Sequence, residues 1–463
     1  MGKGTFGGNT TPEEYFICGR KVGLRECVCT FTGTWISAIT ILSLTGSVYE
    51  EGLSPLLYSV VPWFLGAFIM AAVARRLYEL NVITVPEIFR VKFGSKKLQV
   101  LAGLSLVGVY IFYLVTQYKG FGMVASEMFD IPYPAAVCMV YLFIMYTTIG
   151  GYRSVVRTDM FNLVLLTASL TVVCFSLVLQ CGGIGPLYQR AAEVSGYAHP
   201  GMEAATEAGQ LVRFFQGRFT PLICFSMFWG WGLGLSVNPQ YLVRLFSAKD
   251  SGTAVRTIRV SIALLAYIYF LLVHTGLAMR VLVPSLPAAV ATDGIFIRII
   301  NHELYSPWSG FFFLSVMGAC ISTANSQLLM VASAAAYDIY GTMNEGKVPP
   351  KRIVSVGRFC VLAGGTVAML LTLNPPDFIL SFGGDLWGVV AILLFPTLFL
   401  LAVRPERVTL ESVKGAIYAG VLMIAVFYPL YYYGILTVHP AMIGVPVSGA
   451  ALLWCSARER RRA

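Results

Sequence analysis

Long apolar stretches, each near the length of a membrane-crossing helix, alternate with short polar segments along almost the whole chain. A bilayer core about 30 Å thick is crossed by roughly 20 consecutive apolar residues in a helix. Twelve stretches meet this requirement, so the pattern predicts an all-α polytopic membrane protein with about twelve transmembrane helices. The predicted spans are 24–49, 53–74, 98–126, 131–149, 159–181, 217–243, 257–281, 307–337, 353–373, 378–402, 412–434 and 438–456.

Two of these spans carry residues that weaken helices. Span 1 contains Thr-Gly-Thr at 32–34, and span 6 contains three glycines within 230–234, followed by a Ser-Val-Asn-Pro-Gln run at 236–240. Unwound backbone at membrane depth persists only where protein encloses it. Because spans 1 and 6 begin two consecutive sets of five spans, the matched breaks predict the solute site of a transporter. The alternative is that these glycines only let helices pack closely.

Span 8 carries a polar stripe at mid-depth. Ala319, Ser322 and Thr323 share one helix face, because positions three and four residues apart lie on the same side of a helix. Two hydroxyls beside a backbone carbonyl form an uncharged, oxygen-rich patch that suits a small hard cation such as sodium. The alternative interpretation is interhelical packing by small hydroxylated residues.

Composition and charge narrow the class of protein. Hydrophobic residues make up 57% of the 463 residues and charged residues 12%, whereas soluble proteins carry about 25% charged residues. The net charge of +10 does not indicate a nucleic-acid partner, because the basic residues lie in loops between apolar runs. With the N-terminus inside, 27 of the 33 basic residues fall in cytoplasmic segments. This asymmetry predicts that both ends lie on the cytoplasmic side of the membrane, and we expect that membrane to be the inner membrane of a bacterium.

Four ordered motifs resemble those of the sodium/solute symporter family. The family's EYF-x-x-GR motif is matched by EYFICGR at 14–20, and its GG-x-x-x-V-x-x-TD motif by GGYRSVVRTD at 150–159. NPQYLVR at 238–244 resembles the break in span 6 with the loop that follows it. ACISTANSQ at 319–327, with DIY at 338–340, resembles the span 8 motif and its tail. Each motif is weak alone, but the four in this order and topology are specific.

The resemblance implies the leucine-transporter-type fold of inverted five-helix repeats. It divides the chain into a cytoplasmic segment 1–23, repeat 1 at 24–181, an outer loop 182–216, repeat 2 at 217–402 and peripheral spans 11 and 12 at 403–463. It also implies co-transported sodium bound between spans 1 and 8, and an acid, Asp159, on the sodium exit path. The implied sodium ligands are the carbonyls of Gly33, Ile36 and Ala319 and the hydroxyls of Ser322 and Thr323.

The solute is expected at the two breaks. Lys119 is isolated in apolar span 3; it either neutralises a solute carboxylate or pairs with Asp385 or Glu127, since buried charges are costly unless they are paired or functional. Asp159 likewise has an ordinary alternative, a pair with Arg157. The expected solute contacts are Ser37, Thr40, Gln117, Lys119, Asn238 and Gln240.

Within the family, the motifs look most similar to the pantothenate carriers, with proline, monocarboxylate and sugar carriers as alternatives. We expect a monomer that imports a small organic solute with sodium across the lipid bilayer. A membrane sensor is the second class, but the short tail at 458–463 carries no output domain. A membrane enzyme is the third, and no metal cluster, nucleophile motif or phosphate loop supports it.

The sequence departs from the family pattern at three points. Many members carry an extra span before the first motif, whereas this sequence starts just before that motif. Asn162 replaces the usual Gln after the Thr-Asp pair, and Gln240 replaces the His that often follows the proline of span 6.

Overall fold

A computed structural model describes residues 11–461 apart from 149, 197–205, 218, 287–289, 345–346 and 376–378. The described chain is built from helices, with two isolated β-bridges and no strand. The long unbroken helices are α4 (Val61–Tyr78), α6 (Lys96–Phe129), α7 (Tyr133–Thr148), α8 (Tyr152–Gln180), α13 (Ser251–Leu282), α15 (Ser309–Ser333), α16 (Pro350–Thr372), α17 (Ile379–Val403), α18 (Leu410–Tyr432) and α19 (Ala441–Arg460).

Shorter pieces make up the rest. Span 1 consists of α2 (Leu24–Trp35), η2 (Ile39–Ser43) and α3 (Leu44–Glu51), and span 6 of α10 (Pro221–Met227), η5 (Phe228–Gly232), α11 (Leu233–Ser236) and α12 (Pro239–Phe246). Short π-helical segments extend two other spans, η3 (Leu56–Val60) before α4 and η7 (Ala334–Gly341) after α15. The connecting helices are α1 (Pro12–Ile17), α5 (Glu87–Phe93), α9 (Ile184–Glu193) and α14 (Thr292–Arg298), with turns η1 (Cys18–Arg20), η4 (Gln210–Val212), η6 (Ile299–Glu303) and η8 (Pro405–Arg407).

These helices match the twelve predicted stretches. In the described chain, nine helices are long and apolar enough to cross a membrane, and the bent pair α2 and η2–α3 makes a tenth. The other two predicted spans are α7, with 16 residues, and span 6, which is divided into short pieces. The expected all-α membrane architecture is confirmed, while the exact division into two repeats stays a prediction.

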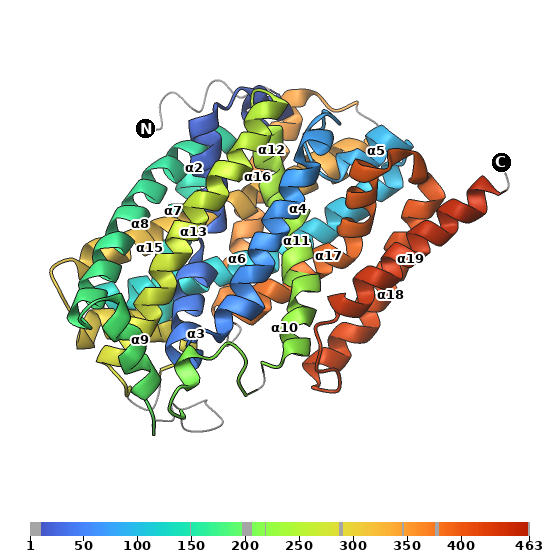
Figure 1. Cartoon of the computed structure of the whole chain (residues 1–463). Helices are drawn as coiled ribbons and strands as arrows, with labels where there is room; N and C mark the ends of the chain where they lie inside the picture. The colour runs from blue at the N-terminus through green and yellow to red at the C-terminus, as the bar shows by residue number, and fades with distance from the viewer. Residues whose placement is uncertain are drawn as a thin grey trace.

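Span 8 occupies the centre of the molecule. The α15–η7 helix is the most deeply buried of the spans and packs against α2, α6, α8 and α16. Helices α18 and α19 pack against each other and against α17, on one flank of the molecule (Figure 1). The segment that carries the polar stripe is therefore surrounded by spans from both halves of the chain.

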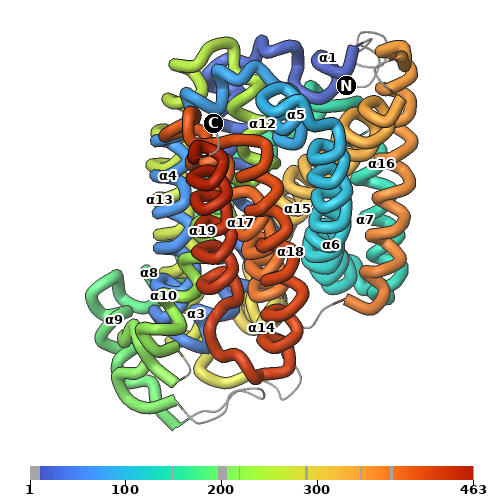
Figure 2. The backbone as a smooth tube through the Cα atoms, turned by 90° about the vertical axis from the view of Figure 1, so that its right-hand side faces the viewer, coloured from blue at the N-terminus to red at the C-terminus, as the bar shows by residue number. Residues whose placement is uncertain are grey.

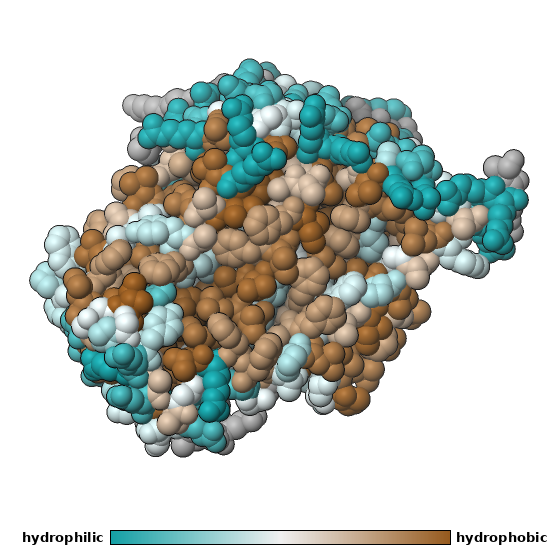
Figure 3. Space-filling view, in the orientation of Figure 1, coloured by the Kyte–Doolittle hydropathy of each residue, from teal (hydrophilic) through white to brown (hydrophobic). Residues whose placement is uncertain are grey.

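The surface has the layering expected of a membrane protein. Apolar residues cover the middle of the face seen in Figure 3, and hydrophilic residues gather at its two ends. Helix α1 and the carboxyl end of α19 lie at the same end of the molecule, and α9 lies at the opposite end (Figure 2). An even number of crossings accounts for this placement.

Candidate functional site

The first break lies just after the position expected from the sequence. Helix α2 continues through 32–34 and ends at Trp35, Ile36 has an extended backbone (φ −81°, ψ 112°), and the two halves of span 1 meet at a bend of 59°. Gly33 stays helical and lets another helix approach, because a Cβ there would lie 3.2 Å from Ser322 Oγ on α15. The sequence predicted unwinding at Gly33, and this is wrong: the helix unwinds three residues later, at Ile36. Gly33 instead allows α15 to pack closely against α2.

In span 6, the glycines and the break also have separate roles. Gly232 and Gly234 are helical and sit against backbone, since added Cβ atoms would lie 2.7 Å from Pro62 O and 2.1 Å from Trp387 O. The chain breaks at Val237 and Asn238, and Asn238 caps α12 by accepting a hydrogen bond from the Gln240 N–H. Proline at the first position of α12 has no N–H to satisfy. The break thus lies within the run 236–240, and the glycines let neighbouring helices pack closely.

The predicted sodium ligands meet where α15 crosses the end of α2. Thr323 Oγ1 donates to the carbonyls of Thr34 (3.2 Å) and Ile36 (3.3 Å). Carbonyls in the last turn of a helix lack partners within the helix, so that of Gly33 can turn to another group, and that of Ile36, just past the helix end, already accepts from Thr323. Ala319 lies one turn before Thr323 on the same face, and all these residues are buried. The arrangement is a neutral, oxygen-rich contact between spans 1 and 8.

Asp159 of α8 adjoins this contact. Its carboxylate is fully buried and accepts hydrogen bonds from Ser322 Oγ (2.6 Å) and from the Thr30 hydroxyl of α2. Arg157 is exposed, and Asp159 is held by these hydroxyls rather than by that arginine. The expected exit-path acid therefore touches one predicted sodium ligand directly.

Several predicted solute contacts hold the breaks in shape. Gln117 Oε1 accepts the Ala38 N–H (3.1 Å), which span 1 leaves free after its turn. Asn238 Oδ1 accepts a hydrogen bond from the Tyr110 hydroxyl (2.6 Å), and the Tyr110 oxygen in turn accepts one from the Gln240 N–H (2.9 Å). The Gln240 amide is buried and has no hydrogen-bond partner in the described chain. Ser37 and Thr40 are buried at the first break, where the Thr40 hydroxyl donates to Trp35 O (3.2 Å).

Lys119 pairs with a residue that the sequence did not single out. Its Nζ lies 2.8 Å from Asp293 Oδ2 of α14, and both side chains are buried. Of the partners expected from the sequence, Asp385 instead accepts from Tyr432 (2.9 Å), and Glu127 contacts His302. Both expected pairings are therefore wrong. Asp293 was overlooked because it lies in the outer segment between spans 7 and 8, which shows no membrane-span pattern.

Arg244 of α12 was also overlooked as a site residue. It counted among the cytoplasmic basic residues of the orientation rule, but its side chain is fully buried. It donates to the Gln240 carbonyl (2.7 Å) and to the Ser326 hydroxyl, which contacts Thr34 Oγ1 (3.0 Å). The ring of Tyr152 lies 5.4 Å from its guanidinium carbon. The available sequence signal was that Arg244 is the one charged residue of α12.

Comparison with known proteins agrees with this geometry. The model of the sodium:solute symporter family matches residues 15–423. Sodium/proline symporters of Staphylococcus aureus are 27% identical over 428 residues, which cover 89% of this chain and 80% of theirs.

Solved structures show the same fold. A sodium-coupled sialic acid symporter superimposes with a TM-score of 0.77 at 18% identity, over 97% of this chain and 93% of that one. A nucleobase-cation-symport-1 transporter in a closed conformation does so with a TM-score of 0.58 at 15% identity, over 99% and 96%. These results confirm the leucine-transporter-type fold. The chain belongs to the sodium:solute symporter family and is a sodium-coupled membrane symporter rather than an enzyme.

Proposed function

We propose that this symporter binds sodium where α15 meets the end of α2, through the Gly33, Ile36 and Ala319 carbonyls and the Ser322 and Thr323 hydroxyls. The observation that carries this proposal is the double contact of Thr323 Oγ1 with Thr34 O and Ile36 O. A cation there would take oxygen ligands from both spans and hold them together. Binding of sodium would thereby favour one conformation of the transporter over the other.

Release of the ion would follow Asp159. Its carboxylate accepts from Ser322, so a cation that leaves the Ser322 hydroxyl meets this negative charge next. Low cytoplasmic sodium would then favour dissociation, with both chain ends on that side as the loop charges indicate. One chain contains both breaks and the whole ion contact, which supports transport by a monomer.

The solute is proposed to be a small molecule that carries a carboxylate. Proline is the first candidate because the relatives from Staphylococcus aureus are sodium/proline symporters. Pantothenate is the second, on the likeness of the motif at 14–23 to pantothenate carriers. The two candidates share a carboxylate and differ in size and in the presence of an ammonium group, so one assay separates them.

The test is uptake of labelled proline and labelled pantothenate into proteoliposomes, with and without an inward sodium gradient. We expect sodium-dependent uptake of one solute, and its loss in Thr323→Ala because the variant lacks one ligand oxygen. Ser333→Ala is the matched control: Ser333 is a buried hydroxyl of the same helix, and among the described residues it bonds only to Met330 O of its own helix (3.1 Å). Equal loss of uptake in both variants, or sodium dependence that survives Thr323→Ala, would contradict the proposed ion site.

A further inference from the structure

Beside the two breaks lies a group of buried side chains that end in polar atoms, four of them aromatic and one an amide. This donor group consists of Trp63 of α4, Tyr113 of α6, Gln240 and Tyr241 of α12, and Trp387 of α17, and all five side chains are buried. Within the described chain, the Nε1 atoms of Trp63 and Trp387, the Tyr241 hydroxyl and both polar atoms of the Gln240 amide have no hydrogen-bond partner.

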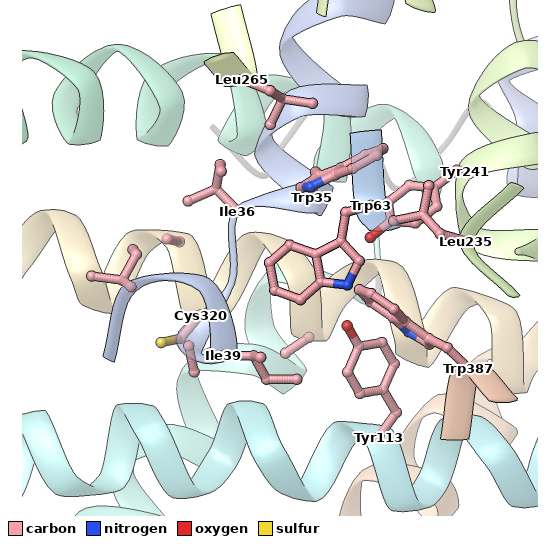
Figure 4. Packing of buried hydrophobic residues seen from close by; sticks show 14 of the residues in the cluster. Trp35, Ile36, Ile39, Trp63, Tyr113, Leu235, Tyr241, Leu265, Cys320 and Trp387 are labelled. Carbon is pink, nitrogen blue, oxygen red and sulfur yellow. The ribbon is translucent and has the colours of Figure 1, made fainter. Parts of the chain in front are cut away.

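These side chains are close to one another. The rings of Trp63 and Trp387 are 5.7 Å apart, and those of Tyr113 and Trp387 are 5.8 Å apart. Figure 4 shows the polar ends of Trp63, Tyr113 and Tyr241 turned toward the middle of the group. The Gln240 amide lies beside the Tyr113 and Tyr241 hydroxyls without reaching hydrogen-bond geometry. The unpartnered atoms therefore belong to one place in the molecule.

The donor group adjoins both breaks. Gln240 and Tyr241 directly follow the break in span 6, and the Tyr241 ring lies 5.1 Å from that of Trp35, the last residue of α2. Glycine also allows α4 to pack closely against span 6, since a Cβ at Gly66 of α4 would lie 2.2 Å from Gly232 O. Buried polar atoms are normally paired, and leaving one unpaired costs free energy. A cluster of them at the expected solute position indicates a ligand that pairs with them.

The chemistry of the atoms restricts that ligand. An indole N–H only donates, and the Tyr241 hydroxyl and the Gln240 amide add further donors. A carboxylate only accepts, so it matches this set, whereas a sugar hydroxyl group both donates and accepts. The Trp35 and Tyr241 rings offer faces that attract a cation. No member of the donor group is charged, and an uncompensated ion there would be costly, so a solute with no net charge is favoured.

From these observations we propose that the donor group recognises a small zwitterionic amino acid, with its carboxylate on the indole N–H groups and its ammonium on the ring faces and the Gln240 oxygen. This inference rests on the proposed symport function and names the class of its solute. Entry of the solute requires the closed rings to separate, and the bound carboxylate supplies the acceptors that the closed group lacks.

The first experiment defines the class with the full chain in detergent and sodium. Thermal unfolding is followed with each standard protein amino acid, with pantothenate, with lactate and with galactose. Stabilisation by at least one amino acid, and not by the other three compounds, is expected. For that amino acid, the amide of its carboxylate should bind at least tenfold more weakly. Stabilisation by pantothenate, lactate or galactose alone, or no discrimination against the amide, would overturn the proposal.

The second experiment tests the residues. Trp63→Phe and Trp387→Phe each remove one N–H and keep an aromatic ring, and we expect roughly tenfold to hundredfold weaker binding of the amino acid, as for loss of a bond to a charged group. Trp229→Phe is the matched control, because its Nε1 is also buried without a partner in the described chain but its ring packs on Phe225, outside the donor group.

Two readouts separate the possible failures. Thermal stabilisation by sodium alone should be unchanged in the tryptophan variants. The amino acid amide should bind the wild type and the variants with the same affinity. A general loss of packing in the variants would change both results. Variants that bind the amino acid like wild type, or a control that weakens binding equally, would overturn the donor group. If amino-acid binding to wild type is independent of sodium but falls in the variants, the proposed symport fails and the donor group stands.

Discussion

At the scale of single residues, Asp159 is the acid closest to the proposed ion site. Its two carboxylate oxygens accept from hydroxyls on two different helices, Thr30 on α2 and Ser322 on α15. A hydroxyl that donates to a carboxylate keeps lone pairs available for a cation. Asp159 therefore orients the Ser322 hydroxyl and makes its oxygen more negative. The sequence had suggested a role for this carboxylate only on the sodium exit path.

Asp159→Asn should weaken sodium binding. The variant keeps the shape of the side chain but removes a negative charge beside a sodium ligand, which at an effective dielectric near 20 amounts to tenfold or more in affinity. The measurement is the sodium concentration that gives half-maximal thermal stabilisation.

Asp250→Asn is the control for this change. Asp250 caps α13 through the Thr253 N–H (2.7 Å) at the surface, and asparagine caps helices equally well. An unchanged sodium midpoint in Asp159→Asn would show that this carboxylate does not act on the ion.

At the scale of elements, four segments meet at Asp293. The short helix α14 presents this carboxylate to Lys119 of α6, to the Ser43 hydroxyl of η2 (2.7 Å) and to the Ile379 N–H of α17 (3.2 Å). Removing one partner of a buried pair is more damaging than replacing both, because the remaining charge is left uncompensated. The contact joins span 1, span 3 and span 10 to the segment between spans 7 and 8, and it occupies Lys119 in this conformation.

Lys119→Met should lower the free energy of unfolding by about 3–5 kcal/mol, because it leaves Asp293 buried without its cation. The double variant Lys119→Met with Asp293→Asn should recover most of this loss, since the asparagine is neutral. Thermal unfolding of both proteins checks the expectation.

The same variants decide the role of Lys119 in solute binding. If solute affinity in the double variant equals that of wild type, Lys119 does not neutralise the solute carboxylate. A single variant as stable as wild type would instead show that the pair contributes little.

At the scale of the whole molecule, one chain of hydrogen bonds joins the break in span 6 to the proposed sodium ligands. Arg244 links Gln240 O to the Ser326 hydroxyl, and Ser326 Oγ donates to Ser322 O (2.9 Å) and contacts Thr34 Oγ1 (3.0 Å). Sodium and solute must tighten each other's binding by the same factor, because coupling between two sites is reciprocal. A buried network that reaches both sites is a physical route for that coupling.

Arg244→Lys should reduce the coupling factor, the ratio of solute affinities with and without sodium, because lysine cannot span both acceptors with a planar fork. Binding of solute without sodium should change much less. Arg280→Lys is the control, since Arg280 is equally buried but lies over the Tyr49 ring, away from the chain of bonds. Equal coupling in Arg244→Lys and wild type would exclude this route.

Much of the architecture follows from the sequence alone. Length and hydropathy require helices that satisfy their own backbone in a bilayer, so the spans could be placed to within a few residues. Helical periodicity placed Ala319, Ser322 and Thr323 on one face, and their neighbours in the structure agree with that pattern. The breaks were detectable because glycine and proline mark local backbone preferences.

Contacts between distant segments were decided only by the tertiary structure. Asp293 lies 174 residues from Lys119, and Trp387 lies far along the chain from Trp63, so no local pattern pairs them. Likewise, glycine is favoured both where a helix unwinds and where another helix approaches, and only packing distinguishes Gly33 beside Ser322 from the turn at Ile36. Periodicity specifies which face of a helix is polar, whereas the partner of that face depends on how all the helices pack together.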